Sequence, residues 1–522
     1  MTKITLKKFL KFLFNNKISK FFWNSKIYFK DDLNFQLIKI QNDNLLRQLY
    51  LSEFKNIKYK STKDTLYHSF NWIEIGKNIG GLPNIVKTRN FIINWYKKNF
   101  SVFSFVWDFH LTAERFLNLI YNYDFYSQNA NNIENRLLND IITSHKNILN
   151  LEFKLFKIYD PYFTGIKAIF LIHIIKRKKL EKISNSIIKN IKVYFNNNGS
   201  HKSYNATIQL IALNNLIEIK NMFLYYKVKS PEILDITIFK SGCYLASLFH
   251  IDQTMSFFNG SNNFYISQTN KLLNKIDNIK KYNFVNIFEG IAVYHDNKKS
   301  VFFDAVSPGK YFSKNNLHAS TLSIEISFNN EKIITNCGSL ETEFNERPDY
   351  LKYSAAHSTI ILDNTNISEI KGEGSFKKFP KLVELNQFNN DDEFVIEGLH
   401  DGYLPKYGIL IKRKVEINKH RNEIKGLDTL VSKKLIGKNK LSYSIRFHLS
   451  PNCSCNMTNN KRSIIIKTNK NIVYIFESSS ELSIEDSIFI SDGKKTSQNK
   501  QIVINSIMKN IKETNNWTLK SV

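Results

Sequence analysis

The sequence predicts two segregated domains, a helical amino-terminal half followed by an antiparallel β-sandwich. Apolar residues recur at helical spacing over about 84–250, whereas short alternating runs of apolar and polar residues begin near Phe288. A chain of 522 residues also exceeds what one hydrophobic core usually organises. Helices followed by strands with little mixing are typical of separate domains. The expected parts are a poorly assigned segment at 1–60, a helical domain at 61–275 and a sandwich at 285–522, with the domain boundary near 265–285.

The helical half consists of segments of similar length joined by short turns. Leu210, Leu213 and Leu216 share one face at helical spacing. Ser230–Glu232 supplies a cap, a proline at the first helical position and an acid in the first turn, so a further helix should open there. The run Asn259–Asn263 then breaks the helical pattern. Such successive helices predict stacked helix pairs. The expected helices are 84–98, 111–126, 133–156, 162–175, 180–195, 206–226 and a last one ending near Phe249.

Two histidines stand at the starts of expected strands. Apolar and polar residues alternate from Leu322 to Phe328, which is the period of a half-buried strand, and Asn329-Asn330 predicts a tight turn. His318 precedes this strand, and His357 precedes another one. Imidazoles at the edge of a sheet can form a metal or proton-transfer site on a rigid frame. The strands expected in this region are 322–328, 332–338 and 359–363.

Charge and cysteine content narrow the classes of function. Lys and Arg number 74 against 46 Asp and Glu, and the resulting net charge of +28 favours anionic partners. Because no long basic block occurs, a compositional drift toward Lys and Asn explains the excess of positive charge equally well. Nucleic acid is supported by charge alone and is the less favoured partner. Four scattered cysteines exclude a disulfide framework, and Cys453 and Cys455 lack the second pair that a zinc ribbon needs.

The amino terminus shows no convincing export signal. Its apolar stretch, residues 9–14, is short, is interrupted by Lys11 and is followed by no small-residue cleavage site. A basic helix on a membrane surface over residues 3–22 is the alternative to a solvated start. No apolar run reaches about 18 residues, so we expect no transmembrane helix.

A series of short motifs runs in a fixed order through most of the chain, from about Asp64 onward. The motifs are residues 68–72, Trp107 with Arg115, Asn198–His201, Asp304-Ala305, residues 318–325, Asn336–Gly338, residues 355–359, residues 400–403, Arg413, residues 426–428, residues 446–449 and residues 501–503. Together they resemble the heparinase II/III-like family of polysaccharide lyases, as a divergent member. The resemblance implies an incomplete α/α toroid followed by a β-sandwich, with the substrate cleft between them.

The resemblance also implies β-elimination on a uronate-containing polysaccharide. In that chemistry a base removes the proton alpha to the carboxylate, a polar group neutralises the carboxylate, and an acid protonates the leaving oxygen. No cofactor is required. The expected proton-handling residues are His201, Tyr204 and His318, where Tyr204 stands one helical turn before Ile208, the position of the family's tyrosine. The residues expected to contact substrate are Asn316, Arg347, Tyr353, Trp107 and Arg115.

The family further implies a structural zinc ion. His318 and His357 match two of its ligands, while the aspartate ligand falls on Asn336, beside which Cys337 offers a thiolate. A plain hairpin would put Asn336 about 16 Å along the strand from His318. The alternative is a pair of histidines that are hydrogen-bonded within a structural corner.

Two functions follow from these observations. The first is a carbon–oxygen lyase acting on an acidic polysaccharide. The second is a non-catalytic glycan-binding or envelope polysaccharide-biosynthesis protein on the same scaffold, which is motivated by Asn316, Ile208 and Asn336 at positions where the family has other residues. Members of the family often work in the periplasm or cell envelope, and the cytoplasm is the alternative for a chain without an export signal.

Overall fold

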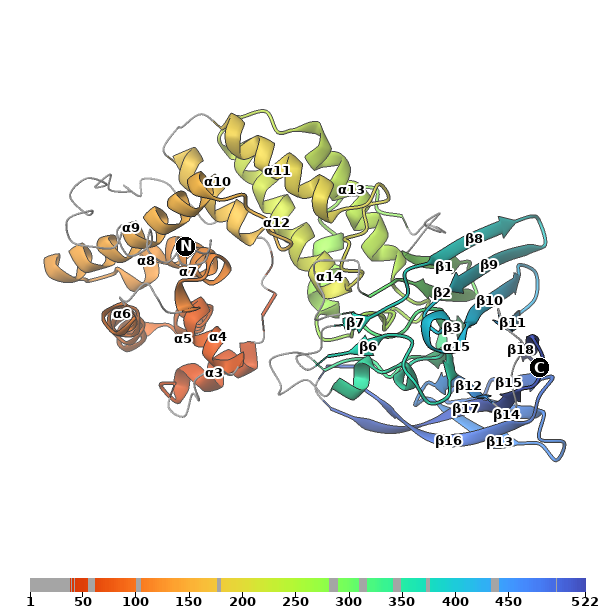
Figure 1. Cartoon of the computed structure of the whole chain (residues 1–522). Coiled ribbons are helices and arrows are strands. Elements are labelled where there is room, and N and C mark those ends of the chain that lie inside the picture. The colour runs from red at the N-terminus through yellow and green to blue at the C-terminus, as the bar shows by residue number, and fades with distance from the viewer. Residues whose placement is uncertain are drawn as a thin grey trace. The chain divides into compact units, whose positions relative to one another are not determined.

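The chain folds into two compact units in the computed structural model shown in Figure 1. The helical unit comprises residues up to 193 together with 211–238, and the strand-rich unit comprises 194–210 together with 239–522. Two segments that the sequence assigns to the helical domain, 194–210 and 239–275, thus group with the strands. The structure describes residues 38, 40–41, 43–54, 62–99, 105–175, 180–280, 290–308, 317–340, 349–371, 376–432, 441–493 and 495–522.

Helices form at each of the predicted segments, although the predicted helix 111–126 divides into α7 and α8, and α3, α4, α5 and α14 are additional to the prediction. Helix α9 begins with a capping box, in which the Asn131 side chain accepts from the backbone N–H of Glu134 and the Glu134 side chain accepts from that of Asn131. Helix α7 packs against α9 and α10. The helices are α3 (Asp43–Leu51), α4 (Thr62–Ser69), α5 (Ile73–Ile79), α6 (Gly81–Lys98), α7 (Phe109–Tyr121), α8 (Tyr123–Tyr126), α9 (Asn132–Leu155), α10 (Thr164–Ile175), α11 (Glu181–Tyr194), α12 (Ala206–Tyr225) and α13 (Glu232–Ser247), with α14 (Ile266–Leu273) in the strand-rich unit. No helix in the described part of the chain is long and apolar enough to span a membrane.

The strand-rich unit contains two antiparallel sheets of eight strands each. The first has the order β1-β2-β3-β4-β12-β17-β16, with β5 paired to β12, and the second has the order β13-β14-β15-β18-β11-β10-β9-β8. The strands of the first sheet are β1 (Gly290–His295), β2 (Lys299–Ala305), β3 (Ser323–Phe328), β4 (Glu331–Thr335), β5 (Ile360–Leu362), β12 (Leu441–Leu449), β16 (Leu482–Phe489) and β17 (Ser497–Met508). Those of the second are β8 (Val383–Asn389), β9 (Glu393–His400), β10 (Ile409–Asn418), β11 (Glu423–Ser432), β13 (Cys453–Met457), β14 (Ser463–Thr468), β15 (Val473–Ser478) and β18 (Lys512–Ser521). A two-stranded sheet of β6 (Glu369–Ile370) and β7 (Phe376–Lys378) stands apart.

Alternation along the strands explains how the two sheets pack. Every second residue of β10 is buried, as expected of a strand with one face on a core. Strand β3 is instead buried on both faces. Ile324 and Ile326 enter the shared core of the sheets, while Glu325 and Ser327 contact His250 on the opposite face. The outer face of the first sheet is therefore covered by the chain around His250.

A bulge in the β3–β4 hairpin fixes where the residues after β4 lie. Asn329 and Asn330 adopt φ values of 47° and 61°, so the predicted tight turn is present. The pairing then shifts between Ile326 and Ser327, and this brings Asn336 to the Glu325 carboxylate. The strand pairing thus directs the Asn336 amide to Glu325.

Gly338, two residues further on, requires its lack of a side chain. It has a φ of +82°, and a Cβ atom would lie 2.0 Å from the carbonyl oxygen of Ile490. Gly338 forms a parallel bridge with Ile490, next to the first sheet. The backbone of the Asn336–Gly338 motif is therefore held against the segment that follows β16.

Candidate functional site

His318 and His357 meet in the strand-rich unit. Nδ1 of His318 lies 3.2 Å from Nε2 of His357, and the two ring centroids are 5.1 Å apart. Both side chains are buried. Burial lowers the pKa of His357 to about 4, so this ring is neutral at pH 7. One imidazole therefore donates to the other, and the contact fixes the orientation of the His318 ring.

Two loops are joined to hold this pair. The N–H of Ala319 donates to the carbonyl of Lys352 at 2.8 Å, and the hydroxyl of Ser354 donates to the carbonyl of Ala319 at 2.7 Å. A short 3-10 turn, Ser354–Ala356, leads directly into His357. The loop before β3 and the loop before β5 are thus joined next to the two imidazoles.

The implied zinc ligands are not arranged around a common point. Sγ of Cys337 lies 3.6 Å from Nδ1 of His448 and 3.8 Å from the Ser487 hydroxyl, and burial raises the pKa of its thiol to about 12. The amide oxygen of Asn336 accepts from the N–H of Ser358 at 2.9 Å. Within the described residues, no three His, Cys, Asp or Glu side chains are grouped as metal ligands. A neutral thiol and an engaged amide do not fit a zinc ion, and we derive no chemistry from one.

Zinc analysis of the purified protein tests this conclusion. We expect much less than one zinc ion per chain, and we expect EDTA to shift Tm by no more than about 1 °C, because the donor set is engaged in hydrogen bonds. Elemental analysis and a thermal melt provide the two measurements. One zinc ion per chain that is lost in His357→Ala would instead establish the histidine pair as ligands.

His201 lies in a tight hairpin between α11 and α12. Its ring is stacked on Tyr194 with the centroids 5.8 Å apart and meets Phe195 edge-on. Its Nδ1 lies 2.8 Å from the hydroxyl of Ser203, and its backbone N–H donates to the side chain of Gln209 at 2.6 Å. The ring is buried among these partners, so His201 supports the turn that carries Tyr204.

Asn259 connects the turn of Tyr204 to His318. The side chain of Asn205 donates to the carbonyl of Asn259 at 2.7 Å. The side-chain oxygen of Asn259 in turn accepts from the backbone N–H of His318 at 3.4 Å. Tyr204 has a positive φ of 48°, and its hydroxyl accepts from the Asn196 amide at 3.2 Å. Asn259 is thus bonded to the backbone of His318 and to Asn205, the residue that follows Tyr204.

A buried carboxyl group and a second tyrosine complete this arrangement. Asp304 accepts from the Ser320 hydroxyl at 2.6 Å and from the backbone N–H of Val306 at 3.0 Å. Burial raises the pKa of Asp304 to about 7 although these bonds and Asn259 oppose the shift. Burial also raises the pKa of Tyr244 well above its usual value, and the neighbouring Tyr204 and Asp304 raise it further. We call the set the Asn259 cluster: Tyr204, Tyr244, Asn259, Asp304, His318 and His357.

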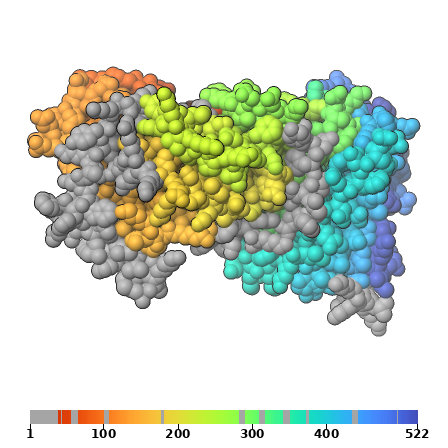
Figure 2. All heavy atoms as spheres, turned by 90° about the horizontal axis from the view of Figure 1, so that it is seen from above, coloured from red at the N-terminus to blue at the C-terminus, as the bar shows by residue number. Residues whose placement is uncertain are grey.

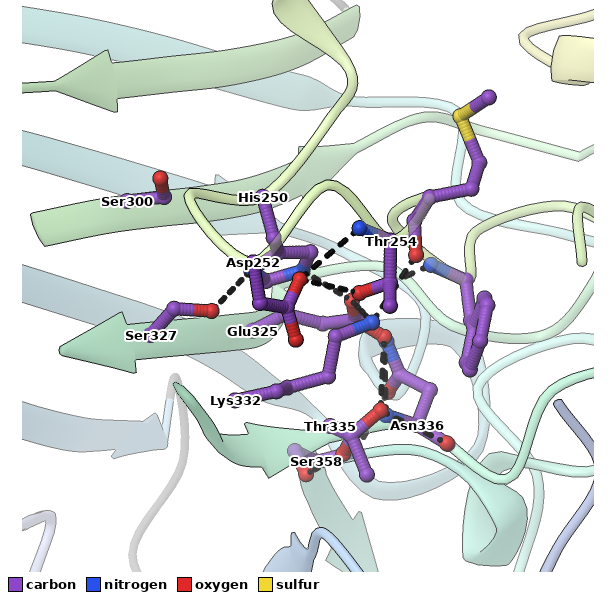
Figure 3. Close-up of polar contacts among 12 residues, drawn as sticks. His250, Asp252, Thr254, Ser300, Glu325, Ser327, Lys332, Thr335, Asn336 and Ser358 are labelled. Atoms are coloured by element: carbon purple, nitrogen blue, oxygen red, sulfur yellow. Dashed lines mark hydrogen bonds and ion pairs between the residues drawn. The ribbon is translucent and has the colours of Figure 1, made fainter. Parts of the chain in front are cut away.

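Behind the cluster, Glu325 is the centre of a buried network, shown in Figure 3. Its carboxylate accepts from Nε2 of His250 at 2.8 Å and from the backbone N–H of Asn336 at 2.9 Å, and it lies 3.4 Å from Nζ of Lys332. Burial alone would raise the pKa of Glu325, but Lys332 and His250 overcome that effect and lower it to about 2. Burial and Lys332 lower the pKa of His250 to about 4. Glu325 is thus a carboxylate at neutral pH, and His250 is uncharged.

Asn336 and Ser358 connect this network to the histidine pair. Asn336 donates to Glu325 and accepts from the N–H of Ser358, the residue that follows His357. The carbonyl of Ser358 accepts from Arg413, which forms a two-bond ion pair with Asp428 at 2.6 and 2.9 Å. Ser358, and with it the position of His357, is therefore held by hydrogen bonds that lead to two buried charged groups, Glu325 and Arg413.

The remaining residues expected to contact substrate have other environments. Tyr353 is 40% exposed and lies just before the turn to His357. Arg115 and Trp107 are fully buried in the helical unit, where the guanidinium lies over the indole of Trp107 and donates to the carbonyl of His68 at 2.8 Å. Both residues belong to the helical unit and are not part of the Asn259 cluster. Asn316 and Arg347 lie outside the described residues.

Sequence reasoning missed Asn259, Tyr244 and the role of Asp304. The run Asn259–Asn263 was interpreted only as the end of the helical pattern, although Asn259 and Gly260 both adopt positive φ values, 53° and 82°. A signal was present, because five consecutive polar or glycine residues exceed what a simple helix stop needs. No local pattern marks Tyr244, which lies within α13.

Comparisons with known proteins address the fold. Residues 289–518 match the family model described as heparinase II/III-like, C-terminal. A solved heparinase III has a TM-score of 0.73 at 10% identity, over 100% of this chain and 91% of that chain. A mutant of the heparan sulfate lyase HepC from Pedobacter heparinus has a TM-score of 0.64 at 12% identity, over 99% of this chain and 88% of that chain. These likenesses confirm the predicted toroid of helices followed by a β-sandwich. No curated protein matches the sequence significantly.

Proposed function

Because the chain is a heparinase II/III-like protein, we propose that it cleaves an acidic, uronate-containing glycan by β-elimination. The observation that carries this proposal is the Asn259 cluster, in which Asn259 accepts from the backbone N–H of His318 and from the side chain of Asn205, the neighbour of Tyr204, while the His318 ring contacts His357. These are the groups that proton abstraction, carboxylate neutralisation and leaving-group protonation require. The reaction requires no redox or phosphate cofactor.

The roles follow from the chemistry of each side chain. Imidazole is a common general base near pH 7, so we assign His318, whose Nδ1 contacts His357, to removal of the proton alpha to the carboxylate. The electron pair forms a carbon–carbon double bond, and the glycosidic carbon–oxygen bond breaks. A phenol can give a proton to the leaving oxygen, and we therefore assign Tyr204 as the acid. We assign the amide of Asn259 to neutralisation of the substrate carboxylate.

An absorbance assay for the unsaturated uronate product tests the site. On a panel of acidic polysaccharides, we expect Tyr204→Phe and His318→Ala each to lower kcat/KM by about 100-fold or more, because each removes a proton-transfer group. The matched controls are Tyr225→Phe and His420→Ala, whose side chains are 52% and 67% exposed, and these should keep wild-type activity. Turnover that survives both site variants would refute the assignment.

Burial of the cluster favours a second candidate function. Tyr204 and His318 are each only 4% exposed, and the family's tyrosine position holds Ile208. A glycan-binding protein that has lost lyase chemistry would have these features. Wild-type protein that binds an acidic glycan by calorimetry, yet yields no unsaturated product on the whole panel, would establish that alternative.

A further inference from the structure

The helical unit contains a basic cavity that the proposed chemistry does not use. Its volume is about 710 Å³, and it lies between the end of α9 and helix α11. Among the residues that the structure describes, its lining contains the four lysines Lys157, Lys182, Lys189 and Lys192 and one acid, Glu181. The segment that contains α11, yellow in Figure 2, reaches the surface on the face drawn there. We call this cavity the lysine groove.

The sequence of α11 places its charges on one side. Lys182, Lys189 and Lys192 follow one another at intervals of seven and three residues, so they lie along one stripe of the helix. The isoleucines Ile183 and Ile187 are fully buried on the other side. The helix thus packs against its unit through its apolar face and presents a row of ammonium groups to the groove.

The opposite wall is fixed rather than loosely attached. The side chain of Asn190, which is 3% exposed, donates to the carbonyl of Ile158 at 3.2 Å and accepts from the backbone N–H of Asp160 at 3.0 Å. These bonds hold the segment after α9 against α11. Lys157 lies 4.9 Å from the ring centre of Tyr159, which is 43% exposed. The groove therefore combines four positive charges with an accessible aromatic face.

We propose that the lysine groove binds the sulfate or carboxylate groups of an acidic glycan chain, as a contact in a unit other than the one that holds the Asn259 cluster. The glycan's identity rests on the proposed function. Among the residues that the structure describes, the cations lining the groove are lysines, which act as point charges for single anionic groups. Tyr159 and the amide of Asn185 fit a sugar ring and its hydroxyl groups.

A charge-matched pair of triple variants tests the groove. The first is Lys182→Gln/Lys189→Gln/Lys192→Gln, and the control is Lys77→Gln/Lys97→Gln/Lys229→Gln, which removes three exposed lysines of the same unit outside the groove. Calorimetry measures binding of a sulfated heparin oligosaccharide, of unsulfated hyaluronan and of single-stranded DNA. We expect the groove variant to bind the heparin oligosaccharide about tenfold more weakly, with the control within about twofold of wild type, since exposed charge contacts are individually modest.

The outcomes separate this inference from the proposed lyase activity. If both triple variants lost the same affinity for the heparin oligosaccharide, only the overall positive charge would attract the glycan, and the proposal would be overturned. A groove variant that lost affinity for DNA alone would overturn the proposal as well. Binding in the groove by a protein that shows no turnover would leave the inference standing while the lyase assignment fails. Thermal melts of both variants confirm that the helical unit stays folded.

Discussion

Replacing Glu325 by alanine is expected to lower the free energy of unfolding of the strand-rich unit by about 3–5 kcal/mol. The change leaves Lys332, which is 5% exposed, without its carboxylate partner. It also leaves backbone donors of Phe257 and Asn336 buried without an acceptor. Each orphaned donor adds to the cost, because it loses its hydrogen bond and regains no water. Differential scanning calorimetry resolves the unit's transition and provides the measurement.

A rescue variant and a surface control make this prediction specific. Glu325→Leu/Lys332→Met removes both charges, so it should recover a large part of the loss. Glu477→Ala breaks an ion pair with Lys520 at 2.7 Å, but both side chains are about 40% exposed, so we expect a change below about 1 kcal/mol. A Glu325→Ala protein as stable as the Glu477→Ala control would contradict the central role of this carboxylate.

Acidification below pH 6.5 is expected to destabilise the strand-rich unit by roughly 4 kcal/mol per pH unit at its steepest. Burial lowers the pKa of four histidines, to about 4 in His250 and His357 and to about 3 in His400 and His448. The unfolded chain takes up these protons near pH 6.5 while the folded unit does not, so stability falls as pH falls from 6.5 toward 4. Asp304, with its pKa raised to about 7, acts in the opposite sense and offsets one of the four protons.

Thermal melts between pH 7 and pH 5 measure this slope. His250→Gln removes one of the titrating groups, so the dependence of stability on pH should become shallower by about one proton. His420→Gln is the matched control, because that ring is 67% exposed and should leave the slope unchanged. A stability that does not change over this range would contradict the neutral state of the buried imidazoles.

The order of helices and strands could be predicted because it depends on local spacing. The sequence placed the hairpin turn at Asn329-Asn330, and both residues adopt positive φ there. It could not predict the bulge between Ile326 and Ser327, because a bulge depends on what the neighbouring strands and side chains require. Because of that extra residue, the Asn336 side chain lies within hydrogen-bond distance of Glu325.

The candidate site shows a similar limit. His318 and His357 could be proposed together, since the motifs that contain them follow the family's order. Tyr244 lies within α13 and Asn259 in the run that ends the helical pattern. Their neighbours in space are 40 or more residues away in the chain, as in the contact of Asn259 with His318. Only tertiary packing brings such residues together, so no periodicity in the sequence signals them.

The covering of the first sheet has a consequence for the modularity of this architecture. The match to the family model begins at residue 289, yet the partners of Glu325 on its outer face include His250 and Phe257. If the sandwich were exchanged between relatives at that border, the Glu325 carboxylate would be separated from the His250 imidazole and the Phe257 backbone N–H that bind it here. We therefore expect a chimera whose crossover carries residues 239–280 along with the strands to be more stable than one joined at residue 289.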